Sequence, residues 1–326
     1  MNLKTFWLNF RYAFRPNKPL LILRLTIAVI KGIFFKKPPL RYVDFSIGFA
    51  CNLRCQHCFA TTLEDNTRRT MKIEDYKRVA EECMRLGTVN FSFQGGEPLL
   101  YKELPEIISV CKPHMNLISV TTNGILLEKE KLLWLKTMGV DILTVSLDSG
   151  IAEEHDRFRG LEGAFNKTIK GIKLALKKGF NVTIGTVITH QSLYSEGLKR
   201  LLELVKEMRL ITYLILPVRA GRWADEKDIF MTDEDMEYIL KLTKSSSYIR
   251  TDFQANLGGY GCGAVKEILY LTPYGDVLAC PFLHSPLGNI FEESIIKIRA
   301  KALRDAVFSK YYDKCIASMP VGQVDR

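Results

Sequence analysis

From residue 42 onward, short apolar runs alternate with longer segments in which apolar residues recur every three to four positions. The short runs predict strands, and the longer segments predict helices. Predicted strands cover residues 42–50, 89–93, 117–122, 142–147, 182–189 and 213–217, and predicted helices cover 72–86, 104–111, 129–138, 164–178 and 197–208. Three of these helices run into Gly87, Gly139 or Gly179, and glycine most readily takes the left-handed backbone that ends a helix.

Six strands separated by helices predict an α/β fold with a parallel sheet and right-handed crossovers. The pattern fits a partial barrel or a doubly wound sheet. Both architectures place their chemistry at the carboxyl ends of the strands. Functional residues are therefore expected directly after each predicted strand.

The last third of the chain has a different pattern. A helix begins at Thr232, an N-cap residue with Asp235 three positions later. Two short strands, 268–271 and 277–280, flank a Pro-Tyr-Gly turn, and a helix over 294–308 follows. The three serines at 245–247 mark a boundary. The expected units are an N-terminal arm (1–41), a core domain (42–245) and a small C-terminal α+β extension (246–326).

The N-terminal arm is basic and apolar. Residues 1–43 contain nine Lys or Arg residues and no Asp or Glu, out of a net charge of +10 for the whole chain. The apolar run 20–35 falls short of the roughly 20 residues that span a bilayer, and it carries Arg24 and Lys31 on the same side as Asn17. Such a helix can lie in a membrane interface with its cations at anionic head groups, or it can close one end of the domain. We favour the membrane interpretation.

The rest of the chain is close to neutral, with 37 basic and 36 acidic residues. This balance does not favour a nucleic-acid-binding surface. Eight clustered cysteines in 326 residues do not resemble a secreted disulfide scaffold, and no signal-peptide cleavage site follows residues 19–35. We expect reduced thiols and a cytoplasmic protein, peripheral on the inner face of the membrane.

Three cysteines follow the first predicted strand. Cys51, Cys55 and Cys58 lie within eight residues, so their thiolates can surround one compact metal centre. A structural zinc ion would want a fourth ligand nearby, and His57 lies too tightly between two of the cysteines to provide it easily. A [4Fe–4S] cluster on three cysteines leaves one iron open for a small molecule. We favour the cluster over zinc and over unrelated core cysteines.

This cysteine spacing resembles the signature of the radical S-adenosylmethionine (SAM) superfamily, with His57 at the family's aromatic position. The resemblance covers residues 42–220 and implies a partial (β/α)6 barrel in which SAM binds the open iron. It also implies that an electron from the cluster cleaves SAM to methionine and a 5′-deoxyadenosyl radical, which abstracts a substrate hydrogen. A reductant such as flavodoxin or ferredoxin would supply the electron.

Residues after later strands agree with this resemblance. Gly95-Gly96-Glu97-Pro98 is similar to the family motif that binds the SAM ammonium, because glycines let the backbone approach a ligand and Glu97 offers a charged partner. After the fourth strand, Ser146 and Asp148 are similar to the family's ribose and carboxylate contact. The other residues that the resemblance suggests near SAM are His57, Thr122, Asn123, Arg157 and Thr186. For Arg157, a solvated loop position is an equal alternative.

A second group of cysteines lies in the C-terminal unit. Cys262 and Cys280 flank the predicted hairpin and resemble the opening of the SPASM and twitch extensions, which hold auxiliary [4Fe–4S] clusters. Cys315 would be the third ligand, so the segment can hold one auxiliary cluster at most. Its fourth iron is open to substrate or bound by Ser318, Asp313 or His284. A degenerate site without a cluster and a zinc site are the alternatives.

Three functional hypotheses follow. The first is a membrane-associated radical SAM enzyme that acts on a lipid or isoprenoid-like substrate. The alternative is a SPASM/twitch-type maturase of a peptide or protein, or an enzyme of cofactor biosynthesis. The third is a non-catalytic Fe–S redox protein, which the complete set of SAM motifs disfavours.

Overall fold

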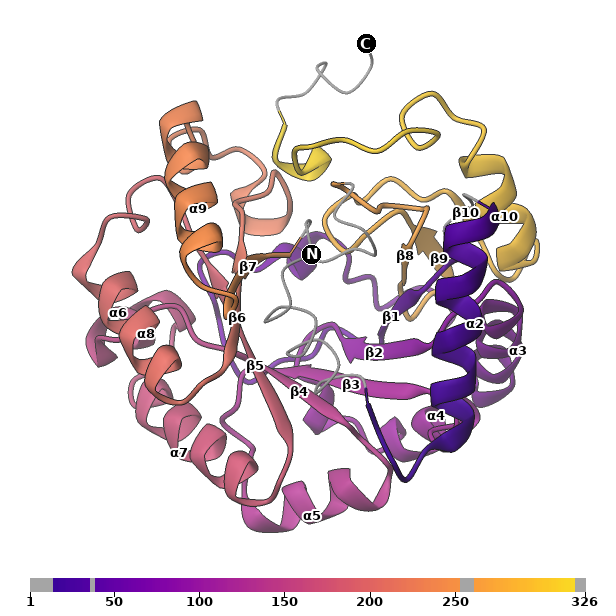
Figure 1. The fold of residues 1–326 in the computed structure, drawn as a ribbon, viewed down its shortest axis with the longest axis horizontal. Coiled ribbons are helices and arrows are strands. Elements are labelled where there is room, and N and C mark those ends of the chain that lie inside the picture. The colour runs from indigo at the N-terminus through magenta and orange to yellow at the C-terminus, as the bar shows by residue number, and fades with distance from the viewer. Residues whose placement is uncertain (1–13, 36–38, 253–260, 320–326) are drawn as a thin grey trace.

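The computed structural model describes residues 14–35, 39–252 and 261–319. Its centre is a curved sheet of parallel strands, surrounded by helices (Figure 1). The parallel strands, in spatial order, are β1 (Tyr42–Ser46), β2 (Asn90–Gln94), β3 (Leu117–Thr122), β4 (Ile142–Ser146), β5 (Asn181–Val187), β6 (Ile211–Ile215) and β7 (Ile249–Thr251). The predicted α/β fold with a partial parallel barrel is confirmed.

The connecting helices begin and end close to the predicted positions. They are α3 (Ile73–Arg85), α4 (Leu104–Val110), α5 (Lys129–Thr137), α6 (Ala152–Arg159), α7 (Ala164–Lys177), α8 (Glu196–Glu207) and α9 (Asp233–Ser245). Gly87, Gly139 and Gly179 take positive φ angles of 105°, 79° and 73° behind α3, α5 and α7, as expected of helix-ending glycines. The sequence did not predict α6, because its eight residues carry too little apolar periodicity.

The C-terminal hairpin extends the same sheet. The predicted strands form β8 (Ile268–Leu271) and β9 (Asp276–Leu278), with β10 (Gly288–Asn289) antiparallel to β9. β8 pairs in parallel with β1, so the sheet has ten strands in the order β10-β9-β8-β1 through β7. α10 (Ile295–Ala302) ends well before the predicted residue 308. β7, which was not predicted, pairs with β6 beyond the expected boundary at residue 245.

Short 3₁₀ turns lie in the loops at the carboxyl ends of the strands and in the C-terminal segment. They are η1 (Phe59–Thr62), η2 (Pro98–Leu100), η3 (Gly221–Trp223) and η4 (Ile316–Ser318). The main core lies between the sheet and its helices, and in it Phe45 stacks on Phe91 and Phe93 with ring centroids 6.0 Å apart. This packing fixes the strand ends that carry the predicted site.

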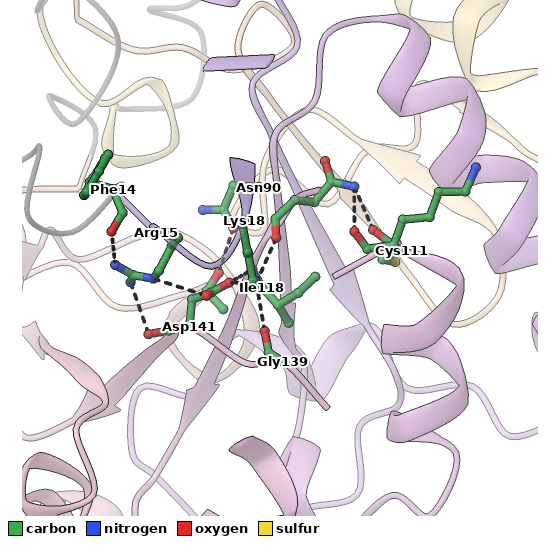
Figure 2. A network of polar contacts seen from close by, with 11 residues as sticks. Phe14, Arg15, Lys18, Asn90, Cys111, Ile118, Gly139 and Asp141 are labelled. Carbon is green, nitrogen blue, oxygen red and sulfur yellow. Dashed lines mark hydrogen bonds and ion pairs between the residues drawn. The ribbon is translucent and has the colours of Figure 1, made fainter. Parts of the chain in front are cut away.

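The N-terminal helix α2 (Pro19–Phe35) closes the opposite end of the barrel. Figure 2 shows the polar contacts of the segment that leads into it: Lys18 Nζ donates to the carbonyls of Asn116 and Gly139, which precede β3 and β4. Arg24 Nη2 donates to the carbonyl of Thr88, at the start of β2. Leu21 is fully buried against Val89 and Leu117.

α2 carries apolar residues on two sides. Leu21 is buried and Arg24 faces the barrel, whereas Leu20, Leu23, Ile27 and Ile30 are 42–56% exposed. The inner face of α2 therefore closes one end of the domain, which was the alternative to the membrane interpretation. None of the described helices is both long and apolar enough to cross a bilayer.

Candidate functional site

The loop after β1 carries the first three cysteines at the carboxyl end of the sheet. The pKa of Cys51 is raised to about 11, mainly by burial and to a smaller extent by Glu97 and the nearby thiols of Cys55 and Cys58. Burial raises the pKa of Cys55 as well, and the Cys58 thiol adds to this increase. The three thiols therefore lie close enough to influence one another's pKa.

The donors on this loop are three free cysteine thiols, those of Cys51, Cys55 and Cys58. A [4Fe–4S] cluster spreads its thiolate ligands over different irons, so its cysteines surround a larger volume than the ligands of a single ion do. Soft thiolate ligands also suit iron–sulfur clusters. The residues present thus fit the predicted group.

The two glycines after β2 dock against the cysteine loop. Gly96 N donates to Gly48 O at 2.8 Å, and Glu97 N donates to Ala50 O at 2.9 Å. A Cβ on Gly96 would overlap the carbonyl oxygen of Ala50, and one on Gly95 would overlap that of Gly48. We expected these glycines to make room for a ligand. The structure shows that they make room for the backbone that carries the cysteines.

Glu97 is only 1% exposed and joins the ends of β2 and β3. Its Oε1 accepts hydrogen bonds from Thr122 Oγ1 at 2.8 Å and Leu99 N at 3.2 Å, and its Oε2 accepts one from Asn123 N at 2.9 Å. Burial raises the pKa of Glu97 to about 7, against the opposing effect of these donors. Asn123 Nδ2 in turn donates to Asn52 Oδ1 at 2.7 Å, beside Cys51. Three predicted strand-end motifs thus meet at one place.

Asp148 is occupied by a neighbour that the sequence analysis missed. Arg159 donates from Nε to Asp148 Oδ2 at 2.6 Å and from Nη2 to Oδ1 at 3.0 Å. Burial raises the pKa of Asp148, but Arg159, together with His57 and His155, more than offsets this effect, so the pKa is lowered. The third nitrogen, Nη1, lies 3.7 Å from Cys55 Sγ. Arg157, the predicted arginine, is exposed, and its guanidinium has no hydrogen bond to a described residue.

The remaining predicted residues after β4 and β5 differ in their availability. Ser146 is half-buried, and its hydroxyl makes no hydrogen bond to another described residue. Thr186 is fully buried and donates to the carbonyl of Leu147 at 2.8 Å, so it braces the end of β4. Ser146 therefore has a free hydroxyl at the strand end, whereas Thr186 has a structural partner.

His57 forms part of an aromatic stack beside the cysteines. Its ring lies 4.5 Å from that of Phe158 at 11°, and 5.7 Å from Trp223. Burial lowers the pKa of His57 to about 3, so the ring is neutral at physiological pH. The neutral ring therefore presents an aromatic surface to Phe158 and Trp223.

The second cysteine group also comes together. Cys280 follows β9, Cys315 precedes η4, and Cys262 N donates to the Tyr312 carbonyl at 2.7 Å. Burial raises the pKa of Cys280, and the thiols of Cys262 and Cys315 add to this effect. Burial likewise raises the pKa of Cys315 to about 12. Cys83 and Cys111, in contrast, are buried in the α3–α4 side of the core.

The three residues proposed as a fourth ligand have different surroundings. Ser318 lies beside Cys315 and donates to the Pro217 carbonyl at 2.7 Å. Asp313 is exposed. Both ring nitrogens of His284 have other partners, Thr62 Oγ1 at 3.1 Å and the Pro281 carbonyl at 3.2 Å.

Asp252 is a fourth candidate that the sequence analysis missed. Its carboxylate lies near enough to Cys262 and Cys315 to raise the pKa of both thiols, after the larger effect of burial. It follows β7, whose three residues were too few to stand out as a strand. Recognising that strand would have placed Asp252 at the carboxyl end of the sheet with the other site residues.

The two cysteine groups are joined by direct contacts. Phe59, next to Cys58, packs edge-on against Phe282 with ring centroids 5.4 Å apart. Farther along the same loop, Arg68 forms a two-point ion pair with Asp276 of β9 at 2.6 and 2.7 Å. The C-terminal unit is therefore fixed against the loop that carries the first three cysteines.

Comparison with protein families agrees with this geometry. The chain matches the radical SAM superfamily over residues 45–209 and SPASM, an iron–sulfur cluster-binding domain, over residues 262–317. It is 27% identical to the AdoMet-dependent heme synthase of Methanosarcina barkeri over 84% of this chain and 85% of that protein. It is 28% identical to the subtilosin biosynthesis protein AlbA of Bacillus subtilis over 78% of this chain, which spans only 58% of AlbA.

A solved structure shows the same fold. SuiB of Streptococcus suis, bound to its precursor peptide SuiA, superposes with a TM-score of 0.66 and 18% identity. The superposition covers 88% of this chain and 70% of SuiB.

Proposed function

Because the chain belongs to the radical SAM superfamily and carries its SPASM iron–sulfur domain, we propose that it is a maturase that modifies a peptide by hydrogen abstraction. When bound, the SAM-binding cluster supplies the electron that cleaves SAM and releases the radical that takes the hydrogen. The protein holds the cofactors, excludes water and orients the substrate. An external one-electron donor such as flavodoxin or ferredoxin reduces the enzyme.

The cysteines divide into two sets of ligands. Cys51, Cys55 and Cys58 hold the SAM-binding cluster, and Cys262, Cys280 and Cys315 hold the auxiliary cluster. His57 provides an aromatic wall beside SAM. Ser146, whose hydroxyl has no described partner, is the best placed ribose contact on β4.

Glu97 has an indirect part in this assignment. Its two oxygens already accept three hydrogen bonds, so in its ionised form Glu97 attracts the SAM ammonium through its charge, from beneath the surface that Thr122 and Asn123 form. The Gly95–Pro98 turn and Asp148 hold the loops in place. The charge that would act on the SAM ammonium is therefore buried and held in a fixed position before SAM binds.

The observation that carries the proposal is the contact between the two cysteine groups. Phe59 and Phe282, and Arg68 and Asp276, connect the first cysteine loop to the hairpin of the second. Cys262, Cys280 and Cys315 would hold the auxiliary cluster close to the loop of Cys51, Cys55 and Cys58, and there it would supply the electron acceptor that an oxidative peptide modification needs.

The relatives support a peptide or a cofactor precursor as substrate rather than a lipid. We expected a lipid or isoprenoid-like substrate, and no reported relative supports it. AlbA, a bacteriocin biosynthesis protein, supports the peptide assignment. A tetrapyrrole is the second candidate, because the alignment with the heme synthase covers 85% of that protein's length.

The test is an anaerobic turnover assay with reconstituted enzyme, SAM and dithionite. The substrates compared are a short peptide encoded beside the gene and iron–coproporphyrin. We expect the peptide to increase the rate of 5′-deoxyadenosine formation and to lose two hydrogen masses. Stimulation by the porphyrin alone would replace the peptide with the tetrapyrrole candidate. No 5′-deoxyadenosine under any condition would exclude radical SAM catalysis.

We also propose that α2 rests on an anionic membrane surface. Leu20, Leu23, Ile27 and Ile30 form an exposed apolar stripe at helical spacing. The segment around it adds cations without a single acid: Lys4, Arg11, Lys31, Lys36 and Lys37. Apolar residues flanked by cations suit a lipid surface that carries negative head groups.

Vesicle co-sedimentation tests this surface. The double variant Leu23→Gln/Ile27→Gln should lose binding to vesicles of phosphatidylglycerol and phosphatidylcholine. The control Leu133→Gln removes a leucine on α5 that is 64% exposed, more than Leu23 or Ile27, and it should bind as the wild type does. Equal binding by all three proteins, or by none, would remove the membrane from the proposal.

A further inference from the structure

We propose that Arg159, oriented by Asp148, donates a hydrogen bond to the Cys55 sulfur and thereby raises the reduction potential of the SAM-binding cluster. The inference rests on the proposed function, because it takes Cys55 as a ligand of that cluster. Arg159 is a positioning residue in this scheme: it acts on the cluster through a ligand and not on the substrate.

Three contacts fix the guanidinium. Arg159 is 6% exposed, at the end of α6. Its Nε and Nη2 grip both oxygens of Asp148, at 2.6 and 3.0 Å, in the two-point geometry that is typical of an arginine–carboxylate pair. Because the fork is planar, this grip sets the direction of Nη1, which lies 3.7 Å from Cys55 Sγ. The donor that faces the Cys55 sulfur, Nη1, is thus oriented by the contacts of Arg159 with Asp148.

The carboxylate is fixed as firmly as the arginine. Asp148 Oδ1 also accepts a hydrogen bond from Val187 N, at the end of β5, at 3.1 Å. Asp148 therefore takes its position from two neighbouring strands of the sheet. The rigid sheet, through Asp148, determines where the guanidinium points.

The backbone of α6 is bonded to the cysteine loop on both sides of Cys55. Arg54 N donates to the Arg159 carbonyl at 3.2 Å, and Gln56 N donates to the Phe158 carbonyl at 2.9 Å. Gly160, with φ of +70°, ends the helix where a Cβ would press against the Arg54 carbonyl at 2.7 Å. Backbone and side-chain contacts therefore fix the position of Arg159 relative to Cys55.

Charge determines the direction of the effect. Reduction adds an electron to the cluster, so a positive group at a ligand sulfur stabilises the reduced state more than the oxidised state. Asp148 lies on the far side of the guanidinium, so the positive end of the pair faces the sulfur. Hydrogen bonds to the ligand sulfurs are among the factors that set the potential of iron–sulfur clusters. Removing the donor should make the cluster harder to reduce.

The test is a redox titration followed by electron paramagnetic resonance, on anaerobically reconstituted full-length protein. The signal of the SAM-binding cluster is recognised by its change when SAM is added. In Arg159→Gln we expect about a tenfold change in the equilibrium between oxidised and reduced cluster, a shift of about 59 mV to lower potential for one electron. Arg159→Lys keeps the charge but not the fork, so its potential should lie between those of Arg159→Gln and the wild type.

Arg85→Gln is the matched control. Arg85 is an exposed arginine at the end of α3, and the neighbouring Leu86 bonds to Leu40, which precedes β1, so it lies at the other end of the barrel. This variant should keep the wild-type potential. A wild-type potential in Arg159→Gln, or the same shift in Arg85→Gln, would overturn the inference.

Two further outcomes are also decisive. If Arg159→Gln fails to retain iron, Arg159→Lys replaces it: a lowered potential supports the inference, and a wild-type potential overturns it. If the wild-type protein itself shows no SAM-responsive signal, the proposed function fails. A SAM-responsive signal with an unchanged potential in the Arg159 variants removes only the role of Arg159.

Discussion

Lys18 Nζ lies 2.5 Å from Asp141 Oδ2, and this ion pair ties the segment before α2 to the start of β4 (Figure 2). Both side chains are about 5% exposed. Asp141 also accepts hydrogen bonds from Arg15 Nε at 3.2 Å and from Ile118 N at 2.9 Å. The basic residues nearest the barrel thus serve to attach the arm, and the arm is an integral part of the fold.

Removal of this lysine should destabilise the protein. Lys18→Met leaves part of a buried charge on Asp141 uncompensated, and breaking a buried ion pair costs about 3–5 kcal/mol. We expect the lower end of that range, because Arg15 still contacts Asp141. Urea unfolding measures the change. Lys199→Met, which breaks the exposed pair with Glu196, should change stability by less than about 1 kcal/mol.

Gly96→Ala should disrupt the first cluster site. The new Cβ would overlap the Ala50 carbonyl, so the cysteine loop must move away from the β2 turn. We expect loss of the SAM-responsive cluster signal with the fold retained by circular dichroism. Gly185→Ala is the control, because its Cβ would meet only side chains at 3.5 Å or more. Full cluster content in Gly96→Ala would show that the loop does not need this close approach.

The carboxyl group of Glu97 should make stability depend on pH. Its pKa is about 7 in the fold and 4.5 ordinarily, so between these values the folded protein binds more protons than the unfolded chain. This contribution is fully present below about pH 4.5 and is lost as the pH rises through 7, by an amount on the order of 3 kcal/mol.

Urea unfolding of cluster-free protein at several pH values between 4.5 and 8 measures this effect. Glu97→Gln cannot ionise and should lack that part of the pH dependence, so the stability difference between the two proteins should change across this window. Parallel stability curves for the wild type and Glu97→Gln would contradict the assignment.

Iron content should report the two cysteine groups separately. With both clusters bound, the wild type should hold about eight irons, and Cys280→Ser should hold about four. Cys83→Ala, which removes a buried core thiol, should keep all of them. Equal iron in Cys280→Ser and the wild type would mean that the SPASM segment of this chain holds no cluster.

The fourth ligand of the auxiliary cluster can be found in the same way. We expect Asp252→Asn to change the spectrum of the auxiliary cluster more than Ser318→Ala does. The reason is that the Asp252 carboxylate acts on both Cys262 and Cys315, whereas the Ser318 hydroxyl acts on Cys315 alone. A larger change in Ser318→Ala would assign the ligand to the serine.

Much of the site was predictable because its signals are local. Cys51, Cys55 and Cys58 are close in sequence, and Gly95–Pro98, Thr122 and Ser146 each follow a strand with a clear apolar pattern. Parallel strands bring their carboxyl ends together whatever the helices between them are. Alternating strands and helices were therefore enough to predict a parallel α/β sheet and the place of its chemistry, and the resemblance carried by the cysteine motif selected the partial barrel.

Other features depended on distant contacts. Arg159 and Arg157 are two residues apart with similar neighbours, and only the folded α6 determines that Arg159 turns inward to Asp148 and Cys55. The sequence did not predict β7, and therefore did not place Asp252, because the three residues of this strand are too few to show an apolar pattern. The pairing of β8 with β1, which unites both cysteine groups in one sheet, joins segments more than 220 residues apart.

The basic, apolar arm shows the same division most clearly. Its composition was determined by the sequence: nine cations, no acids and an apolar run. Which side of α2 faces the barrel was decided by Asp141 and by the carbonyls of Thr88, Asn116 and Gly139, which accept hydrogen bonds from Lys18 and Arg24. A hydrophobic pattern gives the faces of a helix, but the partner that covers a face is a property of the folded chain, because burying a cation is favourable only where acceptors are already in place.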